Sequence, residues 1–315
     1  MKDHHLRAWQ ALVDTGSIRA AARCLHLSQA AVTKAIRELE QDLGAPLIVR
    51  SSRGVTFTEC GRQLTVRVRL AQKQLALARQ DIVQAVGGAN ARVSVAVTPM
   101  VFLGSLPPVL ERFRERMPLA EVTVEEGLMP SALNALREGA IDFAVVAIAT
   151  GSIGGEYEFE PLQTLETIVA CRRGNPFEKS TSWTELLAGI WALNLAPGSQ
   201  HSHLLDYLQQ QGLPLPTRIV RTSSFGVSWN LMTRSDALLP CPAAMLGVEP
   251  YSRHASRVPL LLALPPLQLG ILKLREAPLS MAAELLADLF REYIPAPQHQ
   301  RAPARERVNF RRNAT

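Results

Sequence analysis

The sequence contains little cysteine and no long apolar segment. Its four cysteines, Cys24, Cys60, Cys171 and Cys241, are scattered among 315 residues without a C-x-x-C pair, which indicates free thiols in a reducing compartment. No apolar run reaches the roughly 18 residues that a membrane helix needs. The first residues, MKDHHLRAWQ, lack the apolar core of a secretory signal. These absences predict a cytoplasmic protein with no membrane segment.

Catalytic motifs are missing as well. The chain has neither a G-x-S-x-G nucleophile elbow nor a glycine-rich phosphate loop. His201, His203 and Asp206 could form part of a metal site, but no further ligand at a suitable spacing accompanies them, so polar residues of a surface or cleft are the favoured interpretation. We therefore expect no enzyme activity, no metal and no cofactor.

The net charge of +6 is unevenly distributed along the chain. Residues 1–90 contain 13 Lys and Arg against 7 Asp and Glu, and residues 296–315 contain five Arg and one Glu. The rest of the chain holds 16 basic and 20 acidic residues and is mildly acidic. A basic N-terminal module on an acidic body is typical of a protein that binds a polyanion through one domain.

The segment LSQAAVTKAIRELEQDLG, residues 27–44, predicts an amphipathic helix with an unusual polar side. Val32, Ile36, Leu39 and Leu43 recur at helical spacing and share one side, and Ser28 stands at the N-cap position. On the other side, small and donor-bearing residues come first and the acids only later: Gln29, Ala30, Thr33, Lys34 and Arg37, then Glu38, Glu40 and Asp42.

Two shorter helical patterns precede this segment. The first runs from about Leu6 to Gly16, and Ser17 caps the second, which a tight turn at His26 and Leu27 joins to the next helix. This arrangement predicts a helix-turn-helix, whose last helix places its first residues against base edges in the major groove. We expect Gln29, Thr33 and Lys34, with Ala30 beside them, at base edges, and Ser28 and Arg37 at phosphates.

A β-hairpin and a long helix follow. Two β-prone runs, 47–50 and 55–58, flank Ser51 to Gly54 and predict a wing whose Arg50 and Arg53 contact phosphates or the minor groove. From Thr58 to about residue 86 the apolar residues repeat at alternating spacings of four and three, which is a heptad seam: Leu64, Val68, Ala71, Leu75, Ala78 and Ile82. The seam packs either on its own body or on a second copy. A second copy is favoured because it would present two wings to two half-sites.

With these residues assembled, the chain resembles the LysR-type transcriptional regulators. Residues 21–50 follow the pattern A-A-x-x-L-x-x-S-Q-x-A-V-[ST]-x-x-I-x-x-L-E-x-x-L-G-x-x-L-x-x-R. Three positions depart from the usual family residues: Ala30 stands where Pro or Ser is common, Ile48 where Phe is usual and Cys60 where Ala is usual. Ala30 lies on the reading surface, so base preferences of relatives do not transfer to this chain.

The resemblance covers residues 1–295 and implies an α/β architecture in three parts. These are a winged helix-turn-helix at 1–59, a linker helix for dimerisation at 60–88, and an effector-binding regulatory domain with the type 2 periplasmic-binding-protein fold at 91–295. The basic tail, 296–315, lies outside the family pattern, and its composition predicts disorder.

The body itself shows two sets of alternating strand and helix patterns. These predict two lobes with largely parallel sheets, lobe one at about 91–163 plus 266–295 and lobe two at about 164–265. The run VPLLLALPPL, 258–267, is expected to form a buried strand and one of the two crossings between lobes.

Ligands of such folds lie beyond the carboxyl ends of the strands. That rule selects from lobe one Thr98, Pro99, Met100, Met129, Pro130 and Ala147, and from lobe two Pro197, Ser199, Gln200, His201, Ser223, Ser224 and Phe225. Hydroxyl groups at helix starts suit an anionic or carboxylate-bearing effector. The alternative is that they are ordinary helix caps.

The sequence thus predicts a sequence-specific transcriptional regulator under the control of a small-molecule effector. Expected partners are double-stranded DNA, the effector, further copies of the chain in a dimer or tetramer, and RNA polymerase if the protein activates transcription. Two alternatives remain. One is a solute-binding or sensor protein whose N-terminal helices serve assembly only, and the other is a thiol sensor that uses Cys171 and Cys241.

Overall fold

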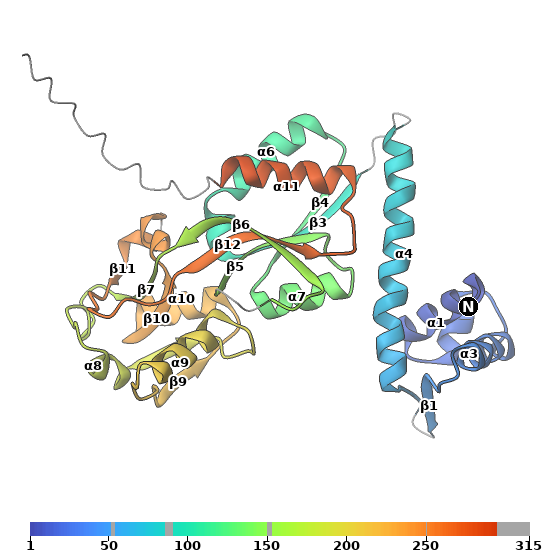
Figure 1. The fold of residues 1–315 in the computed structure, drawn as a ribbon, viewed down its shortest axis with the longest axis horizontal. Coiled ribbons are helices and arrows are strands. Elements are labelled where there is room, and N and C mark those ends of the chain that lie inside the picture. Colours follow the sequence, from blue (N-terminus) through green and yellow to red (C-terminus); the bar gives the residue numbers. More distant parts are fainter. Residues whose placement is uncertain (52–53, 86–90, 150–152, 250, 295–315) are drawn as a thin grey trace, which may run out of the picture.

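The computed structural model describes residues 1–51, 54–85, 91–149, 153–249 and 251–294. Figure 1 shows a helical N-terminal module, a long upright helix beside it, and a two-lobed α/β body on the other side of that helix. This arrangement confirms the predicted fold class. The side chain of Arg50, all of Arg53 and the tail lie outside the described residues, and with them the predicted contacts of the wing and the predicted disorder of the tail.

Three helices and a hairpin form the N-terminal module: α1 (Asp3–Thr15), α2 (Ile18–Cys24), α3 (Gln29–Leu43), β1 (Ile48–Ser51) and β2 (Gly54–Phe57). The hydroxyls of Ser17 and Ser28 cap α2 and α3, as predicted. Trp9 is fully buried at the centre of the core, and its ring meets Phe57 edge-on at 5.4 Å between centroids. The core fixes the direction of α3, which packs against both other helices.

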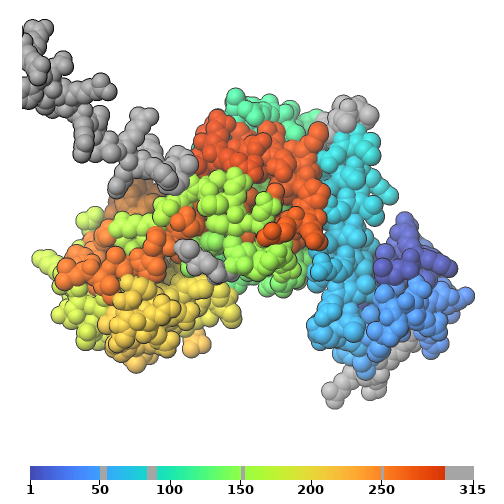
Figure 2. Space-filling model, viewed as in Figure 1, coloured from blue at the N-terminus to red at the C-terminus, as the bar shows by residue number. Residues whose placement is uncertain are grey.

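Helix α4 (Glu59–Ala85) connects the module to the body. The hydroxyl of Thr58 accepts a hydrogen bond from Gly61 N at 3.0 Å and so caps its start. Gly61 is required there because a Cβ would lie 2.3 Å from the Leu47 carbonyl oxygen. On the body side, Lys73 Nζ lies 2.9 Å from Asp142 Oδ1, which joins α4 to lobe one. Figure 2 shows the helix lying along the body.

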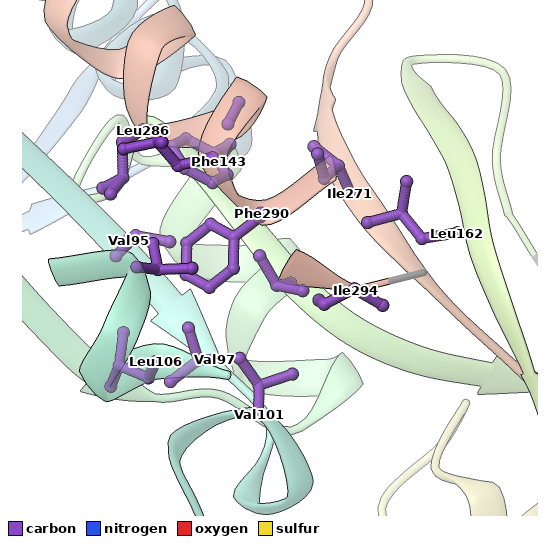
Figure 3. Close-up of a cluster of buried hydrophobic side chains, with 14 of the residues drawn as sticks. Val95, Val97, Val101, Leu106, Phe143, Leu162, Ile271, Leu286, Phe290 and Ile294 are labelled. Atoms are coloured by element: carbon purple, nitrogen blue, oxygen red, sulfur yellow. The ribbon is translucent and has the colours of Figure 1, made fainter. Parts of the chain in front are cut away.

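Lobe one is a five-stranded sheet in the order β4-β3-β5-β12-β6. Its elements are β3 (Arg92–Val97), α5 (Pro99–Leu103), α6 (Leu106–Arg116), β4 (Glu121–Glu126), α7 (Met129–Arg137), β5 (Phe143–Ala149), β6 (Tyr157–Leu165), β12 (Leu267–Leu274) and α11 (Met281–Tyr293). Side chains of α6 and α11 cover one face, where Phe143 and Phe290 meet in the core drawn in Figure 3. Helix α7 covers the other face.

Lobe two has a second five-stranded sheet in the order β11-β7-β10-β8-β9. Its elements are β7 (Thr167–Arg172), α8 (Trp183–Leu187), β8 (Ile190–Leu193), α9 (Gln200–Gln210), β9 (Arg218–Arg221), α10 (Phe225–Arg234), β10 (Ala237–Pro242), the short 3-10 helices η1 (Ala243–Gly247) and η2 (Tyr251–Arg253), and β11 (Ala255–Arg257). The chain passes between the two sheets at Glu166 and again just before β12.

The structure corrects two expectations about the body and adds one strand. Both sheets are mixed, because β12 runs antiparallel to β5 and β6, and β7 runs antiparallel to β10 and β11. The sequence did not reveal β6, an edge strand that contains Pro161 at a register shift, where a missing N–H is tolerated. Residues 258–266 form an irregular segment rather than a strand, and Leu261 is 86% exposed.

Candidate functional sites

The start of α3 presents an exposed, donor-bearing surface. We call Ser28, Gln29, Ala30, Thr33, Lys34 and Arg37 the α3 tip; all of them are exposed except the half-buried Thr33. The Lys34 side chain is 77% exposed. Beneath the tip, Val32, Ile36 and Leu39 are buried, whereas Leu43, predicted to share their side, is 41% exposed because it lies at the last turn. The core therefore holds the helix while its first two turns remain free to contact a partner.

The acids that follow the tip have structural partners. Glu40 Oε1 accepts hydrogen bonds from the backbone N–H groups of Leu47 and Ile48 at 2.8 and 3.2 Å, which fixes the base of the wing. Glu38 accepts from His5, and Asp42 binds the amino group of Met1. The hydrogen bond from His5 is the main reason that the pKa of Glu38 is lowered. These carboxylates hold the module together and lie away from the first turn of α3.

Sequence reasoning missed two arginines next to this surface. Arg19 and Arg23 lie on α2, are exposed, and form no ion pair within the described part of the chain. In a helix-turn-helix the first helix of the motif is the one that crosses a DNA backbone, and these two arginines make the exposed side of α2 positively charged. Their position in the helix before the recognition helix is the signal that would have identified them.

Helix α4 has three distinct faces, so the six-residue seam does not act as one unit. Leu64 and Val68 pack in the N-terminal core, where Val68 is 4% exposed and unavailable to a second copy. Leu77, which the seam did not include, is buried toward lobe one. Ala71, Leu75, Ala78 and Ile82 remain exposed, and we call these four the outer seam. Leu75 and Ile82 are each 66% exposed.

A cleft between the two lobes is lined by residues from both and holds about 790 Å³ of empty space, part of which is open solvent. The structure brings together there most of the residues that the strand-end rule selected: Thr98, Pro99, Met100, Met129, Ala147, Ser199, Gln200, His201, Ser223, Ser224 and Phe225. Pro130 and Pro197 do not line it. The rule also missed contributors such as Asn194, Thr222, Cys241 and Met245. We call this space the inter-lobe cavity.

The polar groups of the inter-lobe cavity are neutral, since no Asp, Glu, Lys or Arg is among its described lining residues. The first turns of α9 and α10 both border it, and Ser199 and Ser224 cap those helices. The hydroxyls of Thr98 and Ser223 make no hydrogen bond to any described residue. Helix N-termini attract negative charge, so the cavity offers dipoles and free hydroxyls to an anionic group, with apolar walls beside them.

His201 has a structural role rather than a free polar group. Its Nδ1 accepts from the backbone N–H of Asn194 at 2.8 Å, so Nε2 carries the proton and donates to the Pro240 carbonyl at 3.0 Å. The side-chain amide nitrogen of Gln200 lies 3.1 Å from the same Nε2, and because both nitrogens carry protons this contact is a hydrogen bond only with the amide turned so that its oxygen faces the ring. His201 therefore ties the start of α9 to β8 and β10, and neither ring nitrogen is available to a metal or an effector.

This role predicts an acid-dependent loss of stability. Burial lowers the pKa of His201 from 6.5 to about 4. As the pH falls through this window the unfolded chain takes up the proton first, so the free energy of unfolding should decrease by up to about 3 kcal/mol. Urea unfolding at pH 7, 6 and 5 measures this. His201→Asn should be less stable at pH 7 but lose less on acidification, whereas equal losses in both proteins would refute the assignment.

The buried cysteines are poorly suited to redox sensing. Burial raises the pKa of Cys171 to about 11 and that of Cys241 to about 12. The two side chains pack in different cores on opposite faces of the lobe-two sheet, so a disulfide between them would require the sheet to rearrange. The structure argues against the thiol-sensor alternative.

Thiol titration should therefore separate the four cysteines. Cys24 and Cys60 are exposed, and the thiolate is the reactive form. We expect two thiols of the native chain to react with Ellman's reagent at pH 8 and all four after unfolding. A Cys24→Ser/Cys60→Ser variant serves as the control and should show none in the native state. Rapid reaction of that variant would show that Cys171 or Cys241 is accessible.

Two family profiles match the chain. Residues 4–62 match "Bacterial regulatory helix-turn-helix protein, lysR family", and residues 87–295 match "LysR substrate binding domain". The first match contains the α3 tip, and the second contains both lobes and the inter-lobe cavity. Among the described residues, no helix is long and apolar enough to cross a membrane.

Named relatives match over most of the chain. The transcriptional regulator TdcA of Escherichia coli K12 is 28% identical over 93% of both chains. The transcriptional regulator GalR of Pseudomonas putida KT2440 is 31% identical over 92% of this chain and 73% of its own. Both are described as regulators with a helix-turn-helix.

Solved structures support the fold at lower identity. A full-length OxyR variant from Pseudomonas aeruginosa superposes with a TM-score of 0.66 at 20% identity, covering 96% of this chain and 99% of its own. Full-length CbnR complexed with its target DNA superposes with a TM-score of 0.62 at 19% identity, covering 93% and 100%. At these identities the likeness is one of fold alone.

Proposed function

Since this chain belongs to the LysR family of bacterial transcriptional regulators, we propose that a small carboxylate in its inter-lobe cavity controls how the α3 tip binds DNA. Proteins of this family bind DNA and small-molecule effectors and oligomerise. In this chain we assign DNA binding to residues 1–59, dimerisation to the linker helix at 60–88 and effector binding to residues 91–295. The observation that carries it is the cavity itself, whose neutral donors come from both lobes.

For DNA, we assign Gln29, Thr33 and Lys34 to base edges, with Ala30 beside them. Ser28, Arg37, Arg50 and Arg53 are assigned to phosphates or the minor groove, and Arg19 and Arg23 are added to this group. The exposure of the α3 tip supports the assignment, because an exposed helix start with amide and ammonium donors fits the major groove. RNA polymerase is a further partner if the protein activates transcription.

Helix α7 offers a route between the two sites. Met129, at its start, lines the inter-lobe cavity, and Leu136, near its end, borders α4. Just beyond its end Asp142 binds Lys73 of α4. A ligand that shifts the lobes would thereby move α4 and the module it carries. Equal DNA affinity with and without bound ligand would contradict this route.

Two surfaces support self-association. The outer seam of α4 leaves apolar side chains exposed, which favours pairing with a second copy. The bodies also present sheet edges of opposite charge: β4, an outer strand of lobe one, carries Glu125 and Glu126, and β9, an outer strand of lobe two, carries Arg218 and Arg221. Contact of β4 in one copy with β9 in another would extend dimers into tetramers.

A ligand screen tests the effector assignment. Small carboxylates are added to the full chain in a thermal-shift assay, and each hit is tested for its effect on DNA binding. Thr98→Val removes a free hydroxyl at nearly constant volume and should weaken binding of the carboxylate by about 10- to 150-fold, the value of one hydrogen bond to a charged group. Thr123→Val, on the exposed face of β4, is the matched control. If Thr98→Val and Thr123→Val bind the carboxylate with equal affinity, the ligand does not contact the hydroxyl of Thr98.

A further inference from the structure

A second group of potential ligands lies in the N-terminal module, remote from the inter-lobe cavity. His4 and His5, in the first turn of α1, face Glu38 of α3, 33 residues after His5 in the sequence. One ligand atom from each residue lies within 4.8 Å of the other two, and no other such group of three occurs among the described residues. Short-range spacing could not predict this group, which we call the His–Glu cluster.

The cluster is held in place by the core. His5 is 3% exposed, and its Nε2 lies 3.0 Å from Glu38 Oε2. The His4 ring meets the His5 ring at 4.2 Å between centroids and remains exposed. His5 Nδ1 is buried and has no hydrogen-bond partner in the described part of the chain. Two of the three ligands are therefore fixed, and the third can rotate into place.

We propose that the His–Glu cluster binds one Zn²⁺ or a similar transition-metal ion. Two imidazoles and one carboxylate form a donor set that such ions prefer, whereas Mg²⁺ and Ca²⁺ prefer oxygen ligands alone. Bonds of about 2.0–2.1 Å place neighbouring ligand atoms of a tetrahedral ion about 3.3 Å apart, close to the separation of His5 Nε2 and Glu38 Oε2. The ion would take the place of the proton that His5 Nε2 donates to Glu38, so that the neutral ring of His5 would carry its proton on Nδ1. Water would complete the coordination.

The position of this site gives the ion a measurable effect. A bound ion would join α1 to α3 and so stabilise the module that carries the α3 tip. The other Glu38 oxygen, Oε1, lies 3.8 Å from Lys34 Nζ, so the ion would bind one helical turn from a side chain assigned to bases. Metal binding itself does not depend on that assignment.

The test uses the full chain with a histidine-free tag at its C-terminus, stripped with EDTA. Competition with a chromophoric indicator should show one Zn²⁺ per chain, and Zn²⁺ should raise the Tm. His4→Ala and Glu38→Gln should each weaken binding about 100-fold or more and abolish the rise in Tm. His254→Ala, which removes an exposed histidine of lobe two, should bind as the parent does.

The variants are chosen so that each result is decisive. His4 is exposed, and Gln at position 38 can still accept from His5, so both proteins should melt like the parent when metal is absent. Binding by His4→Ala or Glu38→Gln as tight as by the parent would overturn the proposal. So would a parent that shows no change in Tm at Zn²⁺ concentrations that saturate the indicator.

Discussion

Replacing Lys34 with alanine is expected to lower the affinity of the chain for its operator by about 30-fold or more. A base contact is worth about 1–3 kcal/mol, and a dimer loses it in both copies. Because the Lys34 side chain is 77% exposed, the fold should be unaffected. Gel shifts with the DNA upstream of its own gene measure the loss, and thermal melting checks the fold.

The control is Lys179→Ala, which removes an exposed lysine from lobe two and should leave DNA binding unchanged. Arg37→Ala should have a different effect, because a lost phosphate contact weakens binding to all DNA sequences alike. It should also reduce the slope of log affinity against log salt concentration by about one per copy. If Lys34→Ala and Lys179→Ala bind DNA equally well, the α3 tip does not read bases. The assembly-only alternative would then regain support.

The second large effect is expected at the outer seam. Leu75→Asp combined with Ile82→Asp should convert the dimer into monomers and reduce binding to a two-half-site operator by about 100-fold or more. Burial of one such side chain contributes about 1.5–3 kcal/mol, and a symmetric pair of helices buries four of them. Sedimentation analysis measures the assembly, and gel shifts measure the DNA affinity.

Ala76→Asp provides the control, because it adds a negative charge to α4 at an exposed position outside the seam. This variant should remain dimeric and bind DNA normally. A parent chain that sediments as a monomer at micromolar concentration would contradict the pairing of α4. If the double variant remains a dimer, the dimer interface lies on another surface of the chain.

The sequence predicted the N-terminal module in detail because its signals are local. Ser17 and Ser28 cap the helices that they were expected to cap, and Thr58 caps the helix that was expected to begin there. The body was predicted less completely. Alternating strand and helix patterns do not specify strand direction, so the antiparallel β12 and β7 were missed. Charged residues and Pro161 concealed β6, which tolerates them only because it lies at an edge.

The candidate sites show the same division between local and distant information. The strand-end rule selected half of the lining residues of the inter-lobe cavity, because parallel strands bring their carboxyl ends together. The rule could not show that both ring nitrogens of His201 already form hydrogen bonds, since one partner, Pro240, is 39 residues away in the sequence. A heptad pattern likewise could not show which residues of α4 face the module, which face lobe one and which remain exposed as the outer seam. Nor could spacing reveal the His–Glu cluster.

Photo-crosslinking from position 30 tests whether the α3 tip lies against DNA bases and whether the effector changes that contact. Ala30 lies at the centre of the exposed α3 tip, and Glu111 is an exposed residue of α6 on the body. Each is replaced in turn by a photoreactive amino acid, and the full chain is irradiated on its upstream DNA with and without an effector hit. We expect crosslinks to bases from position 30 that change in position or yield with the ligand, and none from position 111. Absence of crosslinks from position 30, with the DNA still bound, would contradict this expectation.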